Sequence, residues 1–246
     1  MRRTFALTAI LLATLVIVPQ PALAQLLQLD LGEGSGSSAS RMIQLVALIT
    51  VLSLAPSILV MVTSFTRIIV VLSFLRSAMG IQQTPPNSVL ISLALFLTVF
   101  IMMPTLQTIY DTAIQPLVAE KVTELEALDR ATAPVRDFML NHVREQDLKL
   151  FVDMAKIGPI ATPEETPLRA LIPAFMISEL RRAFEIGFLM FLPFIIIDMV
   201  VASVLMSMGM LMLPPIMISL PFKLIFFVLV DGWYLIAGSL VQSYGT

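Results

Sequence analysis

The feature that most constrains this chain is a set of long apolar runs with few or no charged residues. Four runs stand out: Met42–Thr66, Ser88–Tyr110, Ile186–Ser207 and Ile216–Val241. The first two carry no charge over 25 and 23 residues, and the last two carry one and two charges. Because about 20 apolar residues cross a bilayer as a helix, all four are long enough to span. The sequence therefore predicts an all-α membrane protein with four hydrophobic helical segments.

Composition agrees with this prediction and excludes several other classes. Hydrophobic residues make up 58% of the chain and charged residues 13%, whereas soluble domains are typically about 45–50% apolar and about 25% charged. The formal net charge of −2 argues against a nucleic-acid partner. With no cysteine and one histidine, His142, neither thiolate chemistry nor a multi-histidine metal site is possible. We expect no cofactor and no bound metal.

The charges gather in one block. Residues 111–185 hold nine Lys/Arg and 13 Asp/Glu, which is 22 of the 32 charged side chains. We predict a water-soluble helical region here, with breaks at Pro134, Gly158–Pro159, Pro163 and Pro167. Between Tyr110 and Phe175 its only aromatic residues are Phe138 and Phe151. They form either a small local core or anchors for an interface, where aromatic side chains are enriched.

The first 24 residues are typical of a secretory signal peptide. Arg2 and Arg3 precede an apolar stretch, Phe5–Val18, and Ala22-Leu23-Ala24 is a small-x-small cleavage site before Gln25. Cleavage is thus predicted between Ala24 and Gln25. The alternative, a first transmembrane helix, is disfavoured by the short apolar stretch. Residues 25–41, which include a Gly/Ser-rich segment, are predicted to form a flexible linker.

These segments predict a topology of two helical hairpins. A cleaved N-terminus would lie outside, and residues 42–110 would form the first pair of membrane segments. The connection at 68–87 contains Arg76, follows Arg67 and has no acidic residue, which favours the cytoplasmic side. The block 111–185 would then be periplasmic. Residues 186–246 would form the second hairpin, with a Met-rich turn and an external C-terminus.

Charged residues inside apolar spans are costly and usually functional. Here they are Asp198, Lys223 and Asp231. The midpoint between Asp198 and Lys223 falls in the Met-rich turn, so the two lie at similar depth in a hairpin and can form an ion pair within one chain or between subunits. Such a pair is either a structural salt bridge or part of an ion or proton path. Asp231 has no evident partner in its own segment.

Methionine is concentrated at the predicted turn of the second hairpin. Met206, Met208, Met210 and Met212 alternate with other residues there. Flexible, polarizable thioethers adapt to irregular surfaces, so this turn could form a deformable apolar seal. Ordinary core or lipid-facing packing is the plainer interpretation. A copper site lined by methionine lacks support from histidine or cysteine.

Three stretches of the chain resemble the FliP/SctR family of type III secretion export-gate proteins. They are TSFTRIIVVLSFLR at 63–76 with QQTPPN at 82–87, PAFMISEL at 173–180 with FEIGF at 184–188 and LPF at 192–194, and DMVVASVLMSMGM at 198–210 with LPPIMISLPFK at 213–223 and VDGW at 230–233. Together they cover the chain from about 42 to 241, whereas the 111–170 block carries little motif.

The resemblance implies a pore-forming subunit of a flagellar protein export gate in the bacterial inner membrane, within the flagellar basal body. It implies five copies assembled with FliQ and FliR, association with FlhA and FlhB, and passage of unfolded flagellar proteins. Met206 to Met212 would match a methionine gasket around the closed pore. Glu179, in the second stretch, joins Phe138 and Phe151 as a candidate subunit-interface residue. The apolar helices would be buried partly in subunit contacts and partly in lipid.

Two other classes of protein are alternatives to an export-gate subunit. A secondary transporter for a small solute could use Asp198 and Lys223, but such folds usually show inverted repeats and more spans, and the sequence shows neither. Two membrane aspartates also invite comparison with intramembrane aspartyl proteases, whose Gly-x-Gly-Asp element is absent. We therefore expect no enzymatic activity.

Overall fold

The computed structural model describes residues 38–81, 83–158, 162, 165–210 and 212–245. Every regular element within these ranges is helical, which confirms the all-α prediction for the part of the chain described. The predicted signal peptide at 1–24, with cleavage between Ala24 and Gln25, lies outside these ranges, as does the predicted linker up to residue 37.

The helices follow one another along the chain with short connections. They are α2 (Ser38–Val62), α3 (Phe65–Ala78), α4 (Asn87–Ile109), the π-helical turn η1 (Tyr110–Ile114), α5 (Gln115–Val118), α6 (Glu124–His142), α7 (Glu145–Met154), α8 (Leu168–Ser207), α9 (Pro215–Leu229) and α10 (Gly232–Gln242). By its contacts the chain divides within α2, between Ser53 and Leu54, into two units. All contacts described below lie within the second unit.

Helix α3 occupies much of the connection at 68–87, which the sequence predicts to lie on the cytoplasmic side. It packs against α4 and α8, and Arg67 on it is only 3% exposed. Arg67 is therefore a buried helix residue and not a loop residue, and the cytoplasmic placement of this connection stays a prediction. Periodicity alone does not separate a buried helix from a short connection here. At the break after α2, Thr63 Oγ1 donates to Leu59 O at 2.8 Å.

Among the described residues, two helical stretches are long and apolar enough to cross a membrane. The most apolar 18-residue window within Asn87–Val118, which joins α4, η1 and α5, has a mean hydropathy of 2.4, and the corresponding window within α8 has a mean hydropathy of 2.5. If each of two bent helix pairs is one span, the number rises to four. One bent pair lies within α2, and the other is α9 with α10, whose axes differ by 63°. The predicted fourth segment, 216–241, is thus broken in its second half.

The charged block is helical, as predicted, but its boundaries differ. Pro134 lies inside α6 and does not end it, because packing of α6 on α4 and α8 supports the helix across the missing hydrogen bond. No boundary falls near residue 186 either. Helix α8 begins at Leu168 and runs through the expected junction to Ser207, so the end of the charged block and the third apolar run share one helix.

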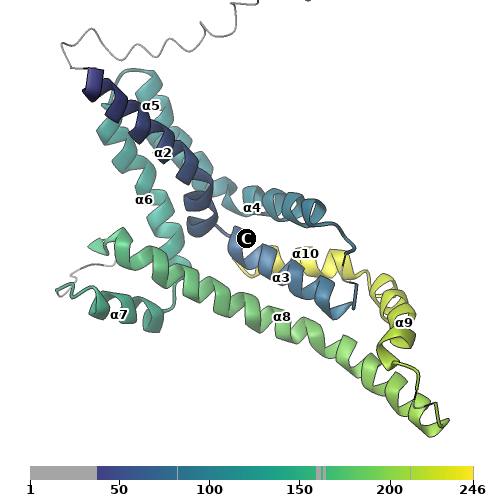
Figure 1. The fold of residues 1–246 in the computed structure, drawn as a ribbon. Coiled ribbons are helices and arrows are strands. Elements are labelled where there is room, and N and C mark those ends of the chain that lie inside the picture. The colour runs from purple at the N-terminus through teal and green to yellow at the C-terminus, as the bar shows by residue number, and fades with distance from the viewer. Residues whose placement is uncertain (1–37, 82, 159–161, 163–164, 211, 246) are drawn as a thin grey trace, which may run out of the picture. The chain divides into compact units, whose positions relative to one another are not determined.

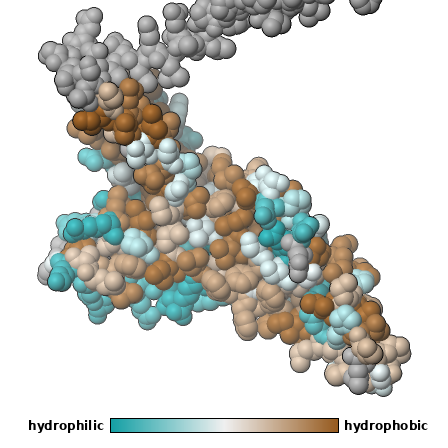
Figure 2. All heavy atoms as spheres, viewed as in Figure 1, coloured by the Kyte–Doolittle hydropathy of each residue, from teal (hydrophilic) through white to brown (hydrophobic). Residues whose placement is uncertain are grey.

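The core lies where α3 is enclosed between α4 and α8, as Figure 1 shows. One cluster of buried side chains joins α3, α4, α6, α8 and α10, and includes Ile68, Leu171, Phe175 and Leu240. A second, smaller cluster joins α3, α8 and α9. Outside this core many large apolar side chains are exposed. Figure 2 shows hydrophilic residues over α7 and the nearby part of α8, and mostly hydrophobic residues along the rest of α8.

Candidate functional site

The Met-rich turn joins α8 to α9, and local signals in the sequence build it. Helix α8 ends at Ser207, and Gly209, two residues later, has a left-handed φ of +73°. Met210 N donates to Leu205 O, and Gly209 N donates to Met206 O, each at 3.0 Å. This pair of bonds is the Schellman motif, in which glycine takes the left-handed position without steric cost. Pro215 then opens α9 at a helix position that needs no N–H.

The four methionines of this turn are all exposed: Met206, Met208, Met210 and Met212, the last 97%. The sequence contains no charged residue between Asp198 and Lys223. The end of the α8–α9 hairpin therefore presents thioethers and aliphatic side chains without charge.

Asp198 and Lys223 meet at the base of that hairpin. Lys223 Nζ lies 2.7 Å from Asp198 Oδ2, and Ser219 Oγ donates to Asp198 Oδ1 at 2.6 Å. Lys223 Nζ also donates to Ala78 O, at the end of α3, at 3.2 Å. Lys223 is 3% exposed and the Asp198 side chain 36%. The pair therefore fastens the hairpin to the last turn of α3, where a helix leaves carbonyl groups unsatisfied.

A second buried ion pair, which the sequence analysis did not anticipate, lies deeper in the core. Arg67 on α3 pairs with Glu179 on α8 through two contacts, one of them from Nε to Oε2 at 2.9 Å. Both side chains are almost completely buried, at 3% and 0% exposure. This side-on arrangement is the strong, bidentate form of an arginine–carboxylate pair. Glu179, a candidate for a subunit interface, is satisfied here within its own chain.

Residues that follow α10 complete the contacts of the Arg67–Glu179 pair. The Tyr244 hydroxyl donates to Glu179 Oε2, and the Arg67 guanidinium lies 3.7 Å from the centre of the Tyr244 ring. Arg67 Nη1 donates to Ser243 O at 3.1 Å. Burial first, and then the nearby Glu179 carboxylate, raise the pKa of Tyr244 well above its ordinary range. The phenol therefore keeps its proton and remains a donor.

The other candidate residues are placed apart from one another. Phe138 on α6 is buried, with its ring stacked 5.9 Å from that of Tyr244, so it belongs to the core of this chain. Phe151 on α7 is half-buried. Asp231 lies at the break between α9 and α10 and is exposed. Among the described residues no group of three or more His, Cys, Asp or Glu could hold a metal ion.

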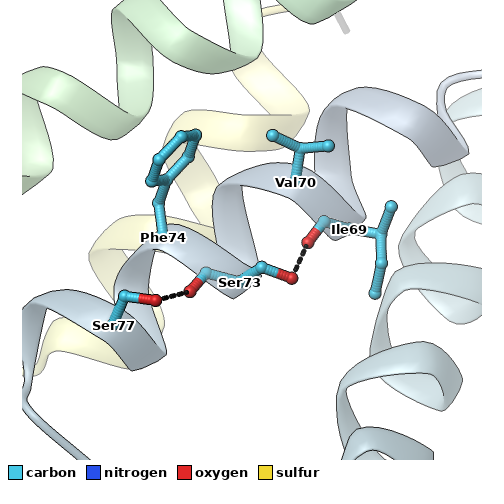
Figure 3. Close-up of a pocket in the computed structure, with 5 residues that line it drawn as sticks. All are labelled: Ile69, Val70, Ser73, Phe74 and Ser77. Carbon is cyan, nitrogen blue, oxygen red and sulfur yellow. Dashed lines mark hydrogen bonds between the residues drawn. The ribbon is translucent and has the colours of Figure 1, made fainter.

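A shallow groove of about 210 Å³ lies on α3, lined by Ile69, Val70, Ser73, Phe74 and Ser77 (Figure 3). Its hydroxyl groups are already used. Ser73 Oγ donates to Ile69 O at 2.8 Å and Ser77 Oγ donates to Ser73 O at 3.0 Å. The groove therefore presents a mainly apolar surface, in which two small serine side chains are of the kind that allows close helix packing.

In the part of the chain that the structure describes, the fold and these contacts define a helical protein with two to four candidate membrane spans, buried ion pairs and an exposed Met-rich turn. Comparison with known proteins narrows this class. The model of the FliP family matches residues 48–240. The flagellar biosynthetic protein FliP of Caulobacter vibrioides is 58% identical over 99% of this chain and 92% of its own length. The proteins of the same name from Bacillus subtilis and Aquifex aeolicus are 55% and 51% identical over 84% and 89% of this chain, and 94% and 91% of their own lengths.

The chain therefore belongs to the FliP family. This confirms the resemblance that the three sequence stretches indicate.

Proposed function

We propose that this chain is a core, pore-forming subunit of the flagellar type III protein export gate, which conducts unfolded flagellar proteins across the bacterial inner membrane. Membership of the FliP family supports a role in building the flagellum, since the relatives are named flagellar biosynthetic proteins. Two to four candidate spans support a place in the membrane. Neither finding favours the alternative, a secondary transporter for a small solute, and an enzymatic role is likewise not proposed.

The gate assembles as a homo-pentamer with FliQ and FliR homologues, and it works with FlhA and FlhB homologues. The apolar surface supports assembly, because a soluble monomer rarely exposes large contiguous apolar patches. A groove of about 470 Å³ between α8 and α9 is lined only by apolar residues, among them Ile197, Val201 and Phe222. Neighbouring subunits cover part of this surface and membrane lipid covers the rest, with residues 111–185 on the periplasmic side.

The observation that carries the proposal is the Met-rich turn, exposed and uncharged at the end of α8. A gate for unfolded chains must exclude ions and yet admit many kinds of side chain. Unbranched methionine side chains have three rotatable bonds, so they pack together when the pore is empty and yield to a passing chain. Met206, Met208, Met210 and Met212 from each copy would together form this gasket, held in place by Asp198 and Lys223.

The test replaces Met208, Met210 and Met212 together with alanine in the assembled complex. Shortening three side chains per copy opens the seal, so we expect ions or small solutes to leak across the membrane. Conductance of membranes containing the complex, and growth of cells on solutes that are normally excluded, both report the leak.

A matched control removes exposed methionines elsewhere, with Met103→Ala on α4 and Met154→Ala on α7. These variants are expected to stay as tight as the native complex. Unchanged conductance in the triple turn variant, with normal assembly, would remove the support for a gasket.

A further inference from the structure

The chain changes direction sharply between α9 and α10, at a residue that rarely adopts the required conformation. Helix α9 ends at Leu229, α10 begins at Gly232, and their axes differ by 63°. Asp231 between them has φ +51° and ψ +54°, which is the left-handed region. For most L-residues this region costs enough to make it roughly tenfold rarer, and aspartate and asparagine tolerate it best after glycine.

Within the described residues, no hydrogen bond or ion pair of the Asp231 carboxylate holds this bend. The side chain is exposed and does not cap α10, and within the described residues it forms none of the ion pairs. Its backbone, by contrast, is fully used. Asp231 N donates to Val228 O and Asp231 O accepts from Leu235 N, each at 3.1 Å.

Gly232 completes the bend because there is no room beside it. A Cβ atom at Gly232 would lie 2.1 Å from the Phe227 ring. That ring is buried, and it packs edge-on against Trp233 with ring centres 5.4 Å apart. The Asp-Gly-Trp sequence therefore encodes both the left-handed turn and the close approach of α9 to the start of α10.

Because of the bend, α9 and α10 pack into two different clusters of the core. Helix α10 is anchored in the larger cluster through Leu240, which is completely buried. Helix α9 lies against α8 through Phe227 in the smaller cluster and through Lys223. The angle at Asp231 thus sets where α9, and the Met-rich turn before it, lie relative to the core.

We propose that Asp231 is a positioning residue that acts through its left-handed backbone and not through its charge. Together, Asp231 and Gly232 set the direction of α9, which is the second arm of the Met-rich hairpin. The inference deepens the proposed gate function, and its export measurement rests on that function.

The first experiment compares Asp231→Asn, Asp231→Gly and Asp231→Val in the complete export complex. Asparagine and glycine adopt the left-handed region readily, whereas β-branched valine does not. We expect export of flagellar proteins near the native level in the first two and roughly tenfold lower in the third. Loss of export in both the asparagine and glycine variants, with normal assembly, would assign the role to the carboxylate. Native export in the valine variant would equally overturn the proposal.

The second experiment uses the space beside Gly232. Gly232→Ala is expected to disturb export because its methyl group meets the Phe227 ring, and Phe227→Leu in the same chain is expected to restore part of it. Gly238→Ala is the matched control, because a Cβ at Gly238 in α10 meets no other atom within 4 Å. If Gly232→Ala behaved like Gly238→Ala, the close approach would have no role.

A distance measurement separates this inference from the gate function. Because the chain has no cysteine, spin labels can be attached at Ile225→Cys on α9 and Leu235→Cys on α10, both exposed. We expect Asp231→Val to shift the distance between the labels in the purified complex, and Asp231→Asn to leave it unchanged. An unchanged distance in the valine variant would refute the positioning role. Should the methionine variants fail to leak, the gasket is wrong, but the distance result is unaffected.

Discussion

Among the described residues, the two buried ion pairs have similar chemistry but differ in their exposure to solvent. Arg67 and Glu179 are both almost completely buried, and the Tyr244 hydroxyl donates a hydrogen bond to Glu179. In the other pair Lys223 is just as buried, but the Asp198 side chain is about one-third exposed. The first pair ties helices distant in sequence into the core, whereas the second ties neighbouring arms of one hairpin together. From this difference we expect the Arg67–Glu179 pair to maintain the fold and the Asp198–Lys223 pair to position the Met-rich turn.

Burial decides what each pair contributes. Moving charges out of water is expensive, so a closed pair adds little net stability, yet loss of one partner leaves an uncompensated charge in the interior. Because every member of the Arg67 pair has a partner with good geometry, it is the more sensitive of the two to single substitutions. In the Asp198–Lys223 pair, the loss of stability on substitution depends on which of the two side chains is removed.

The largest expected effect is that of Arg67→Ala or Glu179→Ala. Either change leaves the other charge buried, and we expect a loss of about 3–5 kcal/mol in the free energy of unfolding. The protein should then fail to accumulate in membranes, and the small purified fraction should unfold at a lower temperature. Immunoblots of membrane fractions and thermal unfolding in detergent provide the measurement.

Two variants sharpen that result. Arg182→Ala removes an exposed partner of Glu185, and such surface pairs are worth about 0–1 kcal/mol, so its abundance should stay near native. The double variant Arg67→Met with Glu179→Leu removes both buried charges and should recover much of the loss. If Arg67→Ala were as stable as Arg182→Ala, the distinction between the core pair and a surface pair would fail.

The next largest effect is expected at the hairpin, where the two partners should differ. Asp198→Ala leaves Lys223 buried with only the Ala78 carbonyl as acceptor, and we expect a loss of about 3 kcal/mol. Lys223→Ala leaves an aspartate that reaches solvent and still accepts from Ser219, so the loss should be nearer about 1 kcal/mol. Export and unfolding of the two variants, measured side by side, show the asymmetry.

The charge-swapped pair tests direct contact. Asp198→Lys with Lys223→Asp should restore part of the export lost in Asp198→Ala. Restoration should be incomplete, because an acid at position 223 cannot donate to the Ala78 carbonyl as Lys223 does. No restoration, despite normal assembly, would argue that the two side chains do not act as a pair.

Sequence reasoning finds the Asp198–Lys223 pair and misses the Arg67–Glu179 pair for a physical reason. The two arms of a hairpin mirror each other about its turn, so Asp198 and Lys223 can be matched by counting residues from the apex. Arg67 and Glu179 are 112 residues apart, and their meeting depends on how α3 packs on α8. No periodicity reports that packing. In the sequence alone, Arg67 is typical of a membrane loop, and only the packing of α3 shows that it is buried. The signal that the sequence offers is a basic residue inside an otherwise apolar motif.

The same distinction applies to the fold. Long apolar runs predict helices well, because their length and hydrophobicity are local properties. Breaks inside them are less visible. The bend at Asp231 depends on one backbone conformation and on the Phe227 ring beside Gly232, and neither changes the hydropathy of the run. Conversely, Pro134 suggests a break that packing of α6 overrides.

The smallest expected effect within the core pair is that of Tyr244→Phe. The ring would stay against Phe138 and the Arg67 guanidinium, and only the hydrogen bond to Glu179 would be lost. Because that bond goes to a charged acceptor which keeps its arginine, we expect a loss of about 2 kcal/mol, smaller than for Arg67→Ala. Thermal unfolding in detergent measures it, with Tyr234→Phe, an exposed tyrosine on α10, as the control. A Tyr244→Phe variant as damaged as Arg67→Ala would mean that the phenol, and not the arginine, chiefly compensates the buried Glu179 charge.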